Sequence, residues 1–232
     1  MKAHLKRLAI PNTWPIPRKL TKYITRPMAG NSLEFSLPLS VVFRDVLKIA
    51  NTAKEVKYLL LNNLIFVNGI QRKDIKQTIG LLDVLQMKSS AGTDEAYRML
   101  LDEKGKFIFV PIKETEVRIR PNKVVGKSLL KGGKVQLNFM NGYNIIVEKD
   151  EFKVGDVVVL ELPEKKVKEI FSLDKGMVVY LLGGSYVGKF GKVVEFDNKN
   201  IIVKVGTETI KTDRKYAFVV GKDKPIITLS AE

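Results

Sequence analysis

The feature that most constrains the fold is a change of hydrophobic period within residues 36–84, from that of a helix to that of a strand. Over residues 36–50 apolar side chains recur every three or four positions, which predicts an amphipathic helix with Ser36 as its N-cap. A second helix is predicted to begin at Thr52, because Thr52 and Glu55 have the spacing of a capping box. Two helices in succession are therefore expected before the first strand.

The strand pattern begins at Leu64 and is soon interrupted by the dipeptide Asn68-Gly69. Asn and Gly accept the left-handed backbone angles of a type I′ turn, so a tight β-hairpin is predicted over residues 64–72. Residues 36–90 are thus expected to form one small module of two helices and a hairpin.

Basic side chains are spread over this module. They are Arg44 and Lys48 on the first helix, Lys54 and Lys57 on the second, and Arg72 and Lys73 after the hairpin turn. Each of them alone is most simply a solvated surface residue. As a set they suit a phosphate backbone better than a small-molecule pocket, so we hypothesise that the module binds RNA.

The positive charge of the chain is uneven. The formal net charge is +15, and residues 1–80 hold 14 of the 40 Lys and Arg residues but only 4 of the 25 Asp and Glu residues. Such a concentration implies a polyanionic partner, either nucleic acid or an acidic membrane surface. No apolar run approaches the roughly 18 residues of a spanning helix, and the N-terminus does not read as a secretory signal. Nucleic acid is therefore favoured, and no membrane partner is expected.

The chain contains no cysteine and a single histidine, His4. Disulfides, thiolate metal sites and multi-histidine zinc sites are therefore excluded, as is a catalytic triad of cysteine and histidine. A chain without cysteine is compatible with a reducing cytoplasm. We expect no catalytic residue, no metal, no cofactor and no small-molecule substrate.

Residues 1–35 are expected to be a basic, extended segment rather than a domain. Through Leu33 they include seven Lys and Arg residues and no acid, together with several prolines that favour an extended chain. Trp14 and Tyr23 lie among these charges and are candidates for stacking on unpaired bases. For Trp14, packing on the edge of the following domain is an equally good interpretation.

Beyond residue 90 the pattern is mainly that of strands. Residues 94–101 fit a helical turn or a strand equally well, and Asn141-Gly142 predicts a second hairpin. Strands are predicted over residues 107–110, 135–139, 143–147, 157–160, 178–182, 191–196, 200–205 and 216–220. Their short, regular spacing predicts a central β domain over residues 91–175 and a small β-barrel over residues 176–232.

Residues 183–189 satisfy the first part of the phosphate-binding loop pattern, G-x-x-x-x-G-K. That motif also needs Ser or Thr at the next position and a helix after it, whereas position 190 is Phe and residues 190–196 fit a strand. Nucleotide binding is therefore rejected. Gly188, Lys189 and Gly191, followed by alternating residues, instead resemble a KOW motif, which implies an SH3-like barrel whose loop meets RNA or protein.

The helical module also carries a resemblance. Residues 66–69 read Phe-Val-Asn-Gly and residues 80–84 read Gly-Leu-Leu-Asp-Val. In this order they resemble a module shared by bacterial small-subunit ribosomal protein four, some pseudouridine synthases and some tyrosyl-tRNA synthetases. The resemblance implies that the helix pair and the hairpin bind structured RNA.

A closer resemblance starts at residues 4–9, His-Leu-Lys-Arg-Leu-Ala, which are followed by Pro11, Trp14 and Arg18-Lys19. With residues 36–39, Ser-Leu-Pro-Leu, they resemble small-ribosomal-subunit protein four of archaea and eukaryotes. That family is distinct from its bacterial namesake. The resemblance continues in the family's order almost to the end of the chain, and it departs from the family pattern at residues 26–31.

This resemblance implies a structural constituent of the small ribosomal subunit that supports translation on the cytoplasmic ribosome. The implied partners are small-subunit ribosomal RNA and neighbouring small-subunit ribosomal proteins. The expected fold is α+β and multi-domain: a basic N-terminal extension, the two-helix and hairpin module, a central β domain and a C-terminal SH3-like barrel. The expected RNA-binding residues are Lys2, His4, Lys6, Arg7, Trp14, Arg18, Lys19, Lys22, Arg26, Arg44, Lys48, Lys54, Lys57, Asn68, Arg72, Lys73, Lys189 and Lys192.

Two other functions are weaker. An RNA-modifying enzyme of the pseudouridine synthase type needs a further catalytic domain with a positioned aspartate, and Asp83 and Asp156 both fall naturally at turns or strand starts. A transcription-elongation factor is suggested by the KOW-like segment alone and leaves the rest of the chain unexplained.

Overall fold

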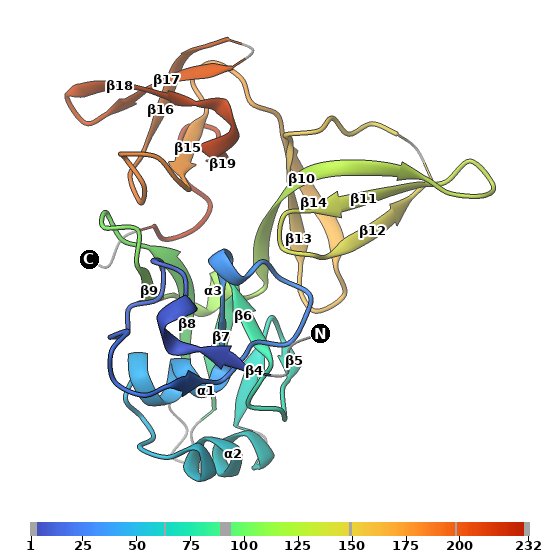
Figure 1. Ribbon diagram of the computed structural model, residues 1–232. Coiled ribbons are helices and arrows are strands. Elements are labelled where there is room, and N and C mark those ends of the chain that lie inside the picture. The colour runs from blue at the N-terminus through green and yellow to red at the C-terminus, as the bar shows by residue number, and fades with distance from the viewer. Residues whose placement is uncertain (1–3, 63, 89–93, 149, 198, 230–232) are drawn as a thin grey trace. The chain divides into compact units, whose positions relative to one another are not determined.

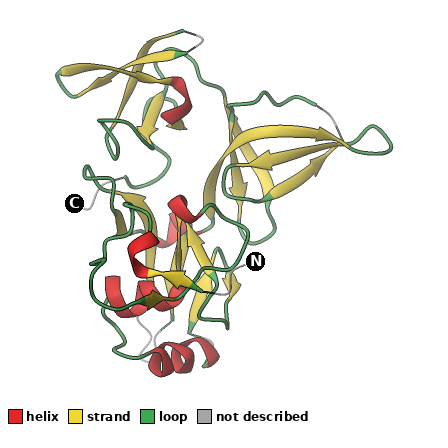
Figure 2. Ribbon diagram, in the orientation of Figure 1, coloured by secondary structure: helices red, strands yellow, loops and turns green. Residues whose placement is uncertain are grey.

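The computed structural model describes residues 4–62, 64–88, 94–148, 150–197 and 199–229. It divides into two compact units, the first of Met1–Leu100 with Lys106–Val117 and the second of Leu101–Gly105 with Arg118–Glu232. The described residues form many strands and few, short helices (Figure 2), so the expected α+β class is confirmed. Each unit is described by itself.

The N-terminal segment is folded onto the first unit. It contains β1 (Leu5–Lys6), which pairs antiparallel with β2 (Tyr23–Ile24), and two 3₁₀ turns, η1 (Arg7–Ala9) and η2 (Leu33–Phe35). Trp14 is 1% exposed, Ile10 and Ile16 are also buried, and the backbone N–H of Phe107 donates to the Thr13 carbonyl at 2.9 Å. The expectation of an extended, solvated segment is therefore wrong, because its apolar residues supply enough buried surface to hold it in place.

The first predicted helix is shorter than expected. Its residues form β3 (Ser36–Pro38), then α1 (Leu39–Val41), then a π-helical turn, η3 (Val42–Val46). Ser36 is not the N-cap, since its hydroxyl donates to the Ser32 carbonyl at 2.7 Å and its backbone pairs with Gly80 of β6 (Thr78–Gly80). The cause is Pro38, which disfavours helical angles at the preceding residue and keeps it in a strand.

The second helix, α2 (Ala53–Leu61), begins where the capping box predicts. The Thr52 hydroxyl accepts from the Glu55 backbone N–H at 3.3 Å. The Glu55 carboxylate accepts from the Asn51 N–H at 2.7 Å. In the usual capping box this bond comes from the N–H of the N-cap residue, which here is Thr52. The bond from Asn51 and a second from the Thr52 hydroxyl to the carboxylate, at 2.9 Å, lower the pKa of Glu55.

The main sheet of the first unit has the strand order β5-β4-β7-β8-β9 (Figure 1). Its strands are β4 (Ile65–Val67), β5 (Ile70–Gln71), β7 (Val84–Met87), β8 (Glu95–Leu101) and β9 (Phe107–Pro111), and the short helix α3 (Glu114–Val117) follows. Asn68 and Gly69 have φ values of 55° and 73° between paired Val67 and Ile70, so the type I′ turn is confirmed. Because β8 and β9 complete this sheet, the boundary expected at residues 90 and 91 falls inside the first unit.

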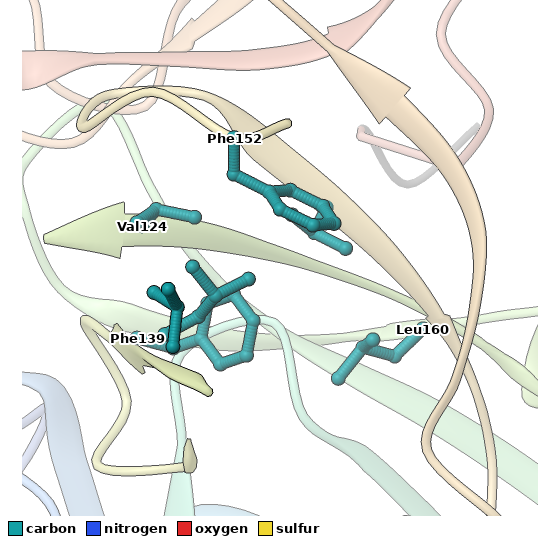
Figure 3. Packing of buried hydrophobic residues seen from close by; sticks show 7 residues of the cluster. Val124, Phe139, Phe152 and Leu160 are labelled. Carbon is teal, nitrogen blue, oxygen red and sulfur yellow. The ribbon is translucent and has the colours of Figure 1, made fainter. Parts of the chain in front are cut away.

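The second unit contains a five-stranded antiparallel sheet of order β12-β11-β10-β13-β14. Its strands are β10 (Ile119–Leu129), β11 (Val135–Phe139), β12 (Asn144–Val147), β13 (Val157–Glu161) and β14 (Lys166–Phe171). Val124, Phe139, Phe152 and Leu160 belong to its buried core (Figure 3). The second Asn-Gly hairpin is present, but its loop is longer than two residues and only Gly142 has a positive φ, 75°.

The other sheet of the second unit has the order β18-β17-β16-β15-β19. Its strands are β15 (Val178–Leu181), β16 (Phe190–Phe196), β17 (Asn200–Val205), β18 (Glu208–Asp213) and β19 (Ala217–Gly221), with the 3₁₀ turn η4 (Arg214–Tyr216) before β19. β16 follows residues 183–189 directly, so the helix that a phosphate-binding loop requires is not there. The buried Tyr180 hydroxyl donates to the Leu101 carbonyl and accepts from the Leu101 N–H, both at 2.8 Å.

Candidate nucleic-acid interface

Four predicted lysines of the first unit are exposed, three on or beside its helices and one after the hairpin. Lys48 follows η3 with a φ of 55°, Lys54 and Lys57 lie on α2, and Lys73 follows the hairpin. None of the four has a carboxylate within 4.0 Å among the residues that the structure describes. Their charges are therefore available to an external anion, and we call these four residues the helix-face lysines.

Two of the predicted arginines, Arg44 and Arg7, meet at one aspartate. Arg44 is half-buried and its Nη2 lies 2.8 Å from Asp45 Oδ2, while Arg7 Nη2 lies 3.9 Å from Asp45 Oδ1. Arg7 is only 3% exposed, and it donates from Nε to the Pro17 carbonyl at 2.7 Å and from Nη1 to the Thr21 hydroxyl at 3.1 Å. The Arg7 side chain thus holds the N-terminal segment in place, and an RNA contact through Arg7 stays a prediction.

Trp14 does not offer a face to a base. Its side chain is buried and its indole Nε1 donates to the Leu33 carbonyl at 3.3 Å. Of the two interpretations, packing on the domain is confirmed, while a contact of Trp14 with RNA stays a prediction. An aromatic residue among charges is buried here because it has the largest apolar surface in the segment.

The polar residues of the N-terminal segment lie at its surface. Tyr23 is 47% exposed, the His4 ring meets it edge-on with centroids 5.1 Å apart, and Lys22 Nζ lies 5.5 Å from its centroid. Other predicted residues here are Lys6, Arg18 and Lys19, which are exposed, Arg26, which is half-buried, and Lys2, which lies outside the described residues. Tyr23 also borders a cavity of about 380 Å³ between this segment and η3.

Asn68 was expected to contact RNA, but it is 1% exposed and serves the fold. Its side-chain oxygen accepts from the Val84 N–H at 3.0 Å, and its own backbone N–H donates to the Val84 carbonyl at 2.9 Å. The residue thus joins the hairpin turn to β7, and its contact with RNA stays a prediction. Arg72, after the same hairpin, is half-buried.

Lys189 and Lys192, the predicted residues of the KOW-like segment, belong to the second unit. Lys189 is half-buried, and Lys192 is exposed with its Nζ 3.5 Å from Asp223 Oδ1. Gly188 has a φ of 81°, and a Cβ there would lie 2.6 Å from the Asp102 backbone. The glycine is thus required by both its angle and its close approach.

The aspartates that an RNA-modifying enzyme would need are used to cap turns. Asp83 Oδ2 accepts from the Gly80 N–H at 2.7 Å, and Asp156 Oδ2 accepts from the Lys153 N–H at 2.9 Å. Both side chains are buried. Within the described ranges, no group of three or more His, Cys, Asp or Glu is placed to hold a metal ion, and no helix is long and apolar enough to cross a membrane.

A second basic site was not predicted. It is an open groove of about 890 Å³ in the second unit, whose cationic lining residues are Lys123, Lys153, Lys199, Arg214 and Lys215. Burial and the neighbouring Arg214 charge lower the pKa of Lys123 to about 8. These residues are scattered over more than 90 positions, so only the pair Arg214-Lys215 forms a visible basic signal in the sequence.

Comparisons with known proteins agree on one family. Residues 93–167 match the model of Ribosomal family S4e, and residues 1–31 match that of the RS4NT (NUC023) domain. The chain is 38% identical over 241 residues to "Small ribosomal subunit protein eS4" of Methanococcus maripaludis strain S2, with 97% of each protein covered. It is 37% identical over 243 residues to the protein of the same name from Methanocaldococcus jannaschii, with 98% of each covered.

A solved structure is also similar. The crystal structure of 30S ribosomal protein S4e from Thermoplasma acidophilum has a TM-score of 0.69 and 25% sequence identity to this chain. The match covers 81% of this chain and 95% of that one.

Proposed function

The chain belongs to the family of small ribosomal subunit protein eS4, and from this premise we propose that its helix-face lysines and N-terminal segment bind the phosphate backbone of small-subunit ribosomal RNA. As a member of this family it is a structural constituent of the cytoplasmic small ribosomal subunit and not an enzyme. Its association is with ribosomal RNA and other ribosomal proteins. The residues that make these contacts are the subject of the proposal.

The observation that carries the proposal is the unneutralised positive charge of the first unit. Residues 1–80 contain four acidic residues. Asp45 pairs with Arg44, whereas Glu55 caps α2 and Asp74 accepts from the Lys76 N–H at 2.8 Å, so these last two satisfy backbone groups. The helix-face lysines have no carboxylate within 4.0 Å among the described residues, and such a surface attracts a polyanion and releases its counterions.

The form of the contact follows from the side chains. Exposed lysines are compact, mobile charges that bind phosphates without reading a sequence. Tyr23, whose ring is exposed beside Lys22 in the same unit, would bind an unpaired base by stacking. We therefore propose recognition of a folded RNA by its shape and charge, with one stacking position at Tyr23.

The test is the salt dependence of binding to a small-subunit ribosomal RNA transcript. A variant with Lys48→Gln, Lys54→Gln, Lys57→Gln and Lys73→Gln should lower the slope of log affinity against log salt concentration by about 4, or about 1 per lysine. The matched control replaces four exposed lysines of the second unit, Lys168, Lys204, Lys211 and Lys222, by Gln. Equal slopes for the wild type and the helix-face variant would overturn the proposal.

We also propose that residues 176–232 form an SH3-like barrel of the KOW type, and that residues 118–175 form the central β domain. The strand order β18-β17-β16-β15-β19 and the close approach of Gly191 to the Lys204 carbonyl support the first assignment. Replacing Gly191 by Val should destabilise this segment, because any side chain there collides with β17. Limited proteolysis of that variant checks whether residues 118–175 stay protected.

A further inference from the structure

We propose that the groove of the second unit binds a phosphodiester segment of the same RNA, as a second contact separate in sequence from the helix-face lysines. All of its lining residues belong to the second unit. This inference rests on the proposed function, because it takes ribosomal RNA as the polyanion. It adds a site, a ligand chemistry and a set of residues that the sequence did not single out.

The groove is lined by more cationic than anionic side chains. Five cationic residues line it, against three carboxylates, Asp156, Asp174 and Asp213. Asp156 is buried and accepts from the Lys153 backbone N–H at 2.9 Å, and Asp213 pairs with Lys215 at 3.0 Å. This leaves four cationic residues, Lys123, Lys153, Lys199 and Arg214, and one remaining carboxylate, that of Asp174, so the groove keeps an excess of positive charge.

Lys123 is held in a way that a surface lysine is not. Its Nζ donates to the Lys215 carbonyl at 3.0 Å and to the Ala217 carbonyl at 2.6 Å. An ammonium group has three N–H donors, so two neutral carbonyls leave one donor and the whole positive charge for another partner. The nearby Arg214 repels this charge, and a bound phosphate would relieve both the repulsion and the cost of burial.

Arg214 is also fixed in place. Its guanidinium lies over the Phe196 ring, with the central carbon 5.4 Å from the ring centroid. Stacking leaves the edge of the guanidinium open, and that edge is the fork that binds phosphate oxygens in pairs. The turn η4, which carries Arg214, follows directly on β18 and is therefore positioned by the sheet.

The size of the groove agrees with this ligand. A volume of about 890 Å³ is in the range of sites that enclose a drug-sized molecule, and one or two nucleotides are of that size. The groove is open rather than enclosed, so a continuous strand can enter and leave it. Its polar lining favours a charged backbone over an apolar ligand.

The experiment compares two charge-matched variants of the full chain. The groove variant carries Lys153→Gln, Lys199→Gln and Arg214→Gln, and the control carries Lys204→Gln, Lys211→Gln and Lys222→Gln, all exposed and outside the groove. With a small-subunit ribosomal RNA transcript, the groove variant should bind at least about tenfold more weakly and lose about 3 from the salt slope, while the control stays within about twofold.

Two outcomes would overturn the inference. If the groove variant binds the transcript like the control, while the helix-face variant is weakened, the groove does not contact RNA and the proposed function stands. If inorganic phosphate or uridine monophosphate protects the wild type against thermal unfolding and the groove variant binds RNA normally, the site takes a free phosphate instead. If the wild type itself does not bind the transcript, the proposed function is wrong, and so is the inference that rests on it.

A second measurement avoids substitution altogether. Lys123 can be followed by acylation of its amine with acetic anhydride and mass spectrometry, since a lysine of lowered pKa is a good nucleophile. The transcript should reduce acylation of Lys123 at least about fivefold, because a phosphate beside the amine holds it protonated. Lys204 should react equally with and without RNA. Unchanged acylation of Lys123 in the complex would overturn the inference.

Discussion

The two basic sites of this protein hold their charges in different ways. The helix-face lysines are exposed, lie on or beside short helices or, for Lys73, after the hairpin, and have no carboxylate within 4.0 Å among the described residues. In the groove of the second unit, Lys123 is fastened to two carbonyl oxygens and Arg214 is stacked on Phe196. The first site is a mobile set of charges, and the second is a fixed one.

This difference implies different contributions to binding. Mobile lysines follow the phosphates wherever the RNA places them, so they give affinity and fast association with little dependence on geometry. Fixed cations have already lost their conformational freedom, so they bind a phosphate in one position and define how the RNA is placed. The helix-face lysines are therefore suited to attracting the RNA and the groove to orienting it.

The largest predicted effect is on stability, and it tests whether the N-terminal segment is packed onto the rest of the first unit. Trp14→Ala should lower the free energy of unfolding by about 3–5 kcal/mol, because it leaves a large cavity under a fully buried indole. The measurement is denaturant unfolding, with Leu20→Ala, at a residue that is 69% exposed, as the control. A change below about 0.5 kcal/mol for Trp14→Ala would mean that the segment is free, and its charges would then be as mobile as the helix-face lysines.

The next effect tests the rigidity of the second unit. Tyr180→Phe should cost about 1–3 kcal/mol, because the N–H and the carbonyl of Leu101 both lose their buried partner. Tyr186→Phe, at a partly exposed tyrosine of the same unit, serves as the control and should be nearly neutral. Equal stabilities of the two variants would show that this pair of bonds does not hold residues 101–105 in place.

A smaller effect is expected at the start of α2, where the helix-face lysines Lys54 and Lys57 are carried. Thr52→Ala removes the N-cap and should lower the stability of the first unit by about 1 kcal/mol. Thr207→Ala, in an exposed turn of the second unit, is the control. RNA affinity should stay the same in both variants, since mobile lysines tolerate fraying of the helix end. A loss of affinity in Thr52→Ala would mean that the helix-face lysines are as preorganised as the groove.

The smallest effect is a pH dependence that only the groove should have. The folded pKa of Lys123 is about 8, below that of an ordinary lysine, so its charge is present below pH 8 and is lost as the pH rises through that value. RNA affinity should fall a few-fold between about pH 7 and pH 9, and Lys123→Arg should remove this step because arginine stays charged. The other charged groups lining the groove are Lys153, Asp156, Asp174, Lys199, Asp213, Arg214 and Lys215. If RNA affinity fell equally with pH in Lys123→Arg, the titrating group would be another one.

The sequence predicts those parts of the structure that local chemistry decides. The Thr52 cap and the Asn68-Gly69 turn both form as expected, because each needs only the preferences of adjacent residues. Ser36 fails as a cap for an equally local reason, the proline two residues later. β10 was missed altogether, since Pro121, Gly126 and several charges interrupt its alternation, although it is the central strand of its sheet.

Burial and distant contacts were the parts that the sequence could not supply. Trp14 lies in a basic, proline-rich segment, and nothing nearby in the sequence reveals the Leu33 carbonyl that its indole meets. Asn68 looks like an exposed turn residue, but its side chain is turned inward to β7. The groove joins Lys123 to Arg214, and only folding brings them together. Family resemblance identified the class of protein without placing these residues.

The most direct test of the account is the salt dependence of RNA binding for four proteins: the wild type, the helix-face variant, the groove variant and the combination of both. If two separate sites contact the same RNA, the slope should fall by about 4, about 3 and about 7, respectively, in the three variants. A combined variant whose slope is no lower than that of the helix-face variant alone would contradict the account, because the groove would then contribute no phosphate contact.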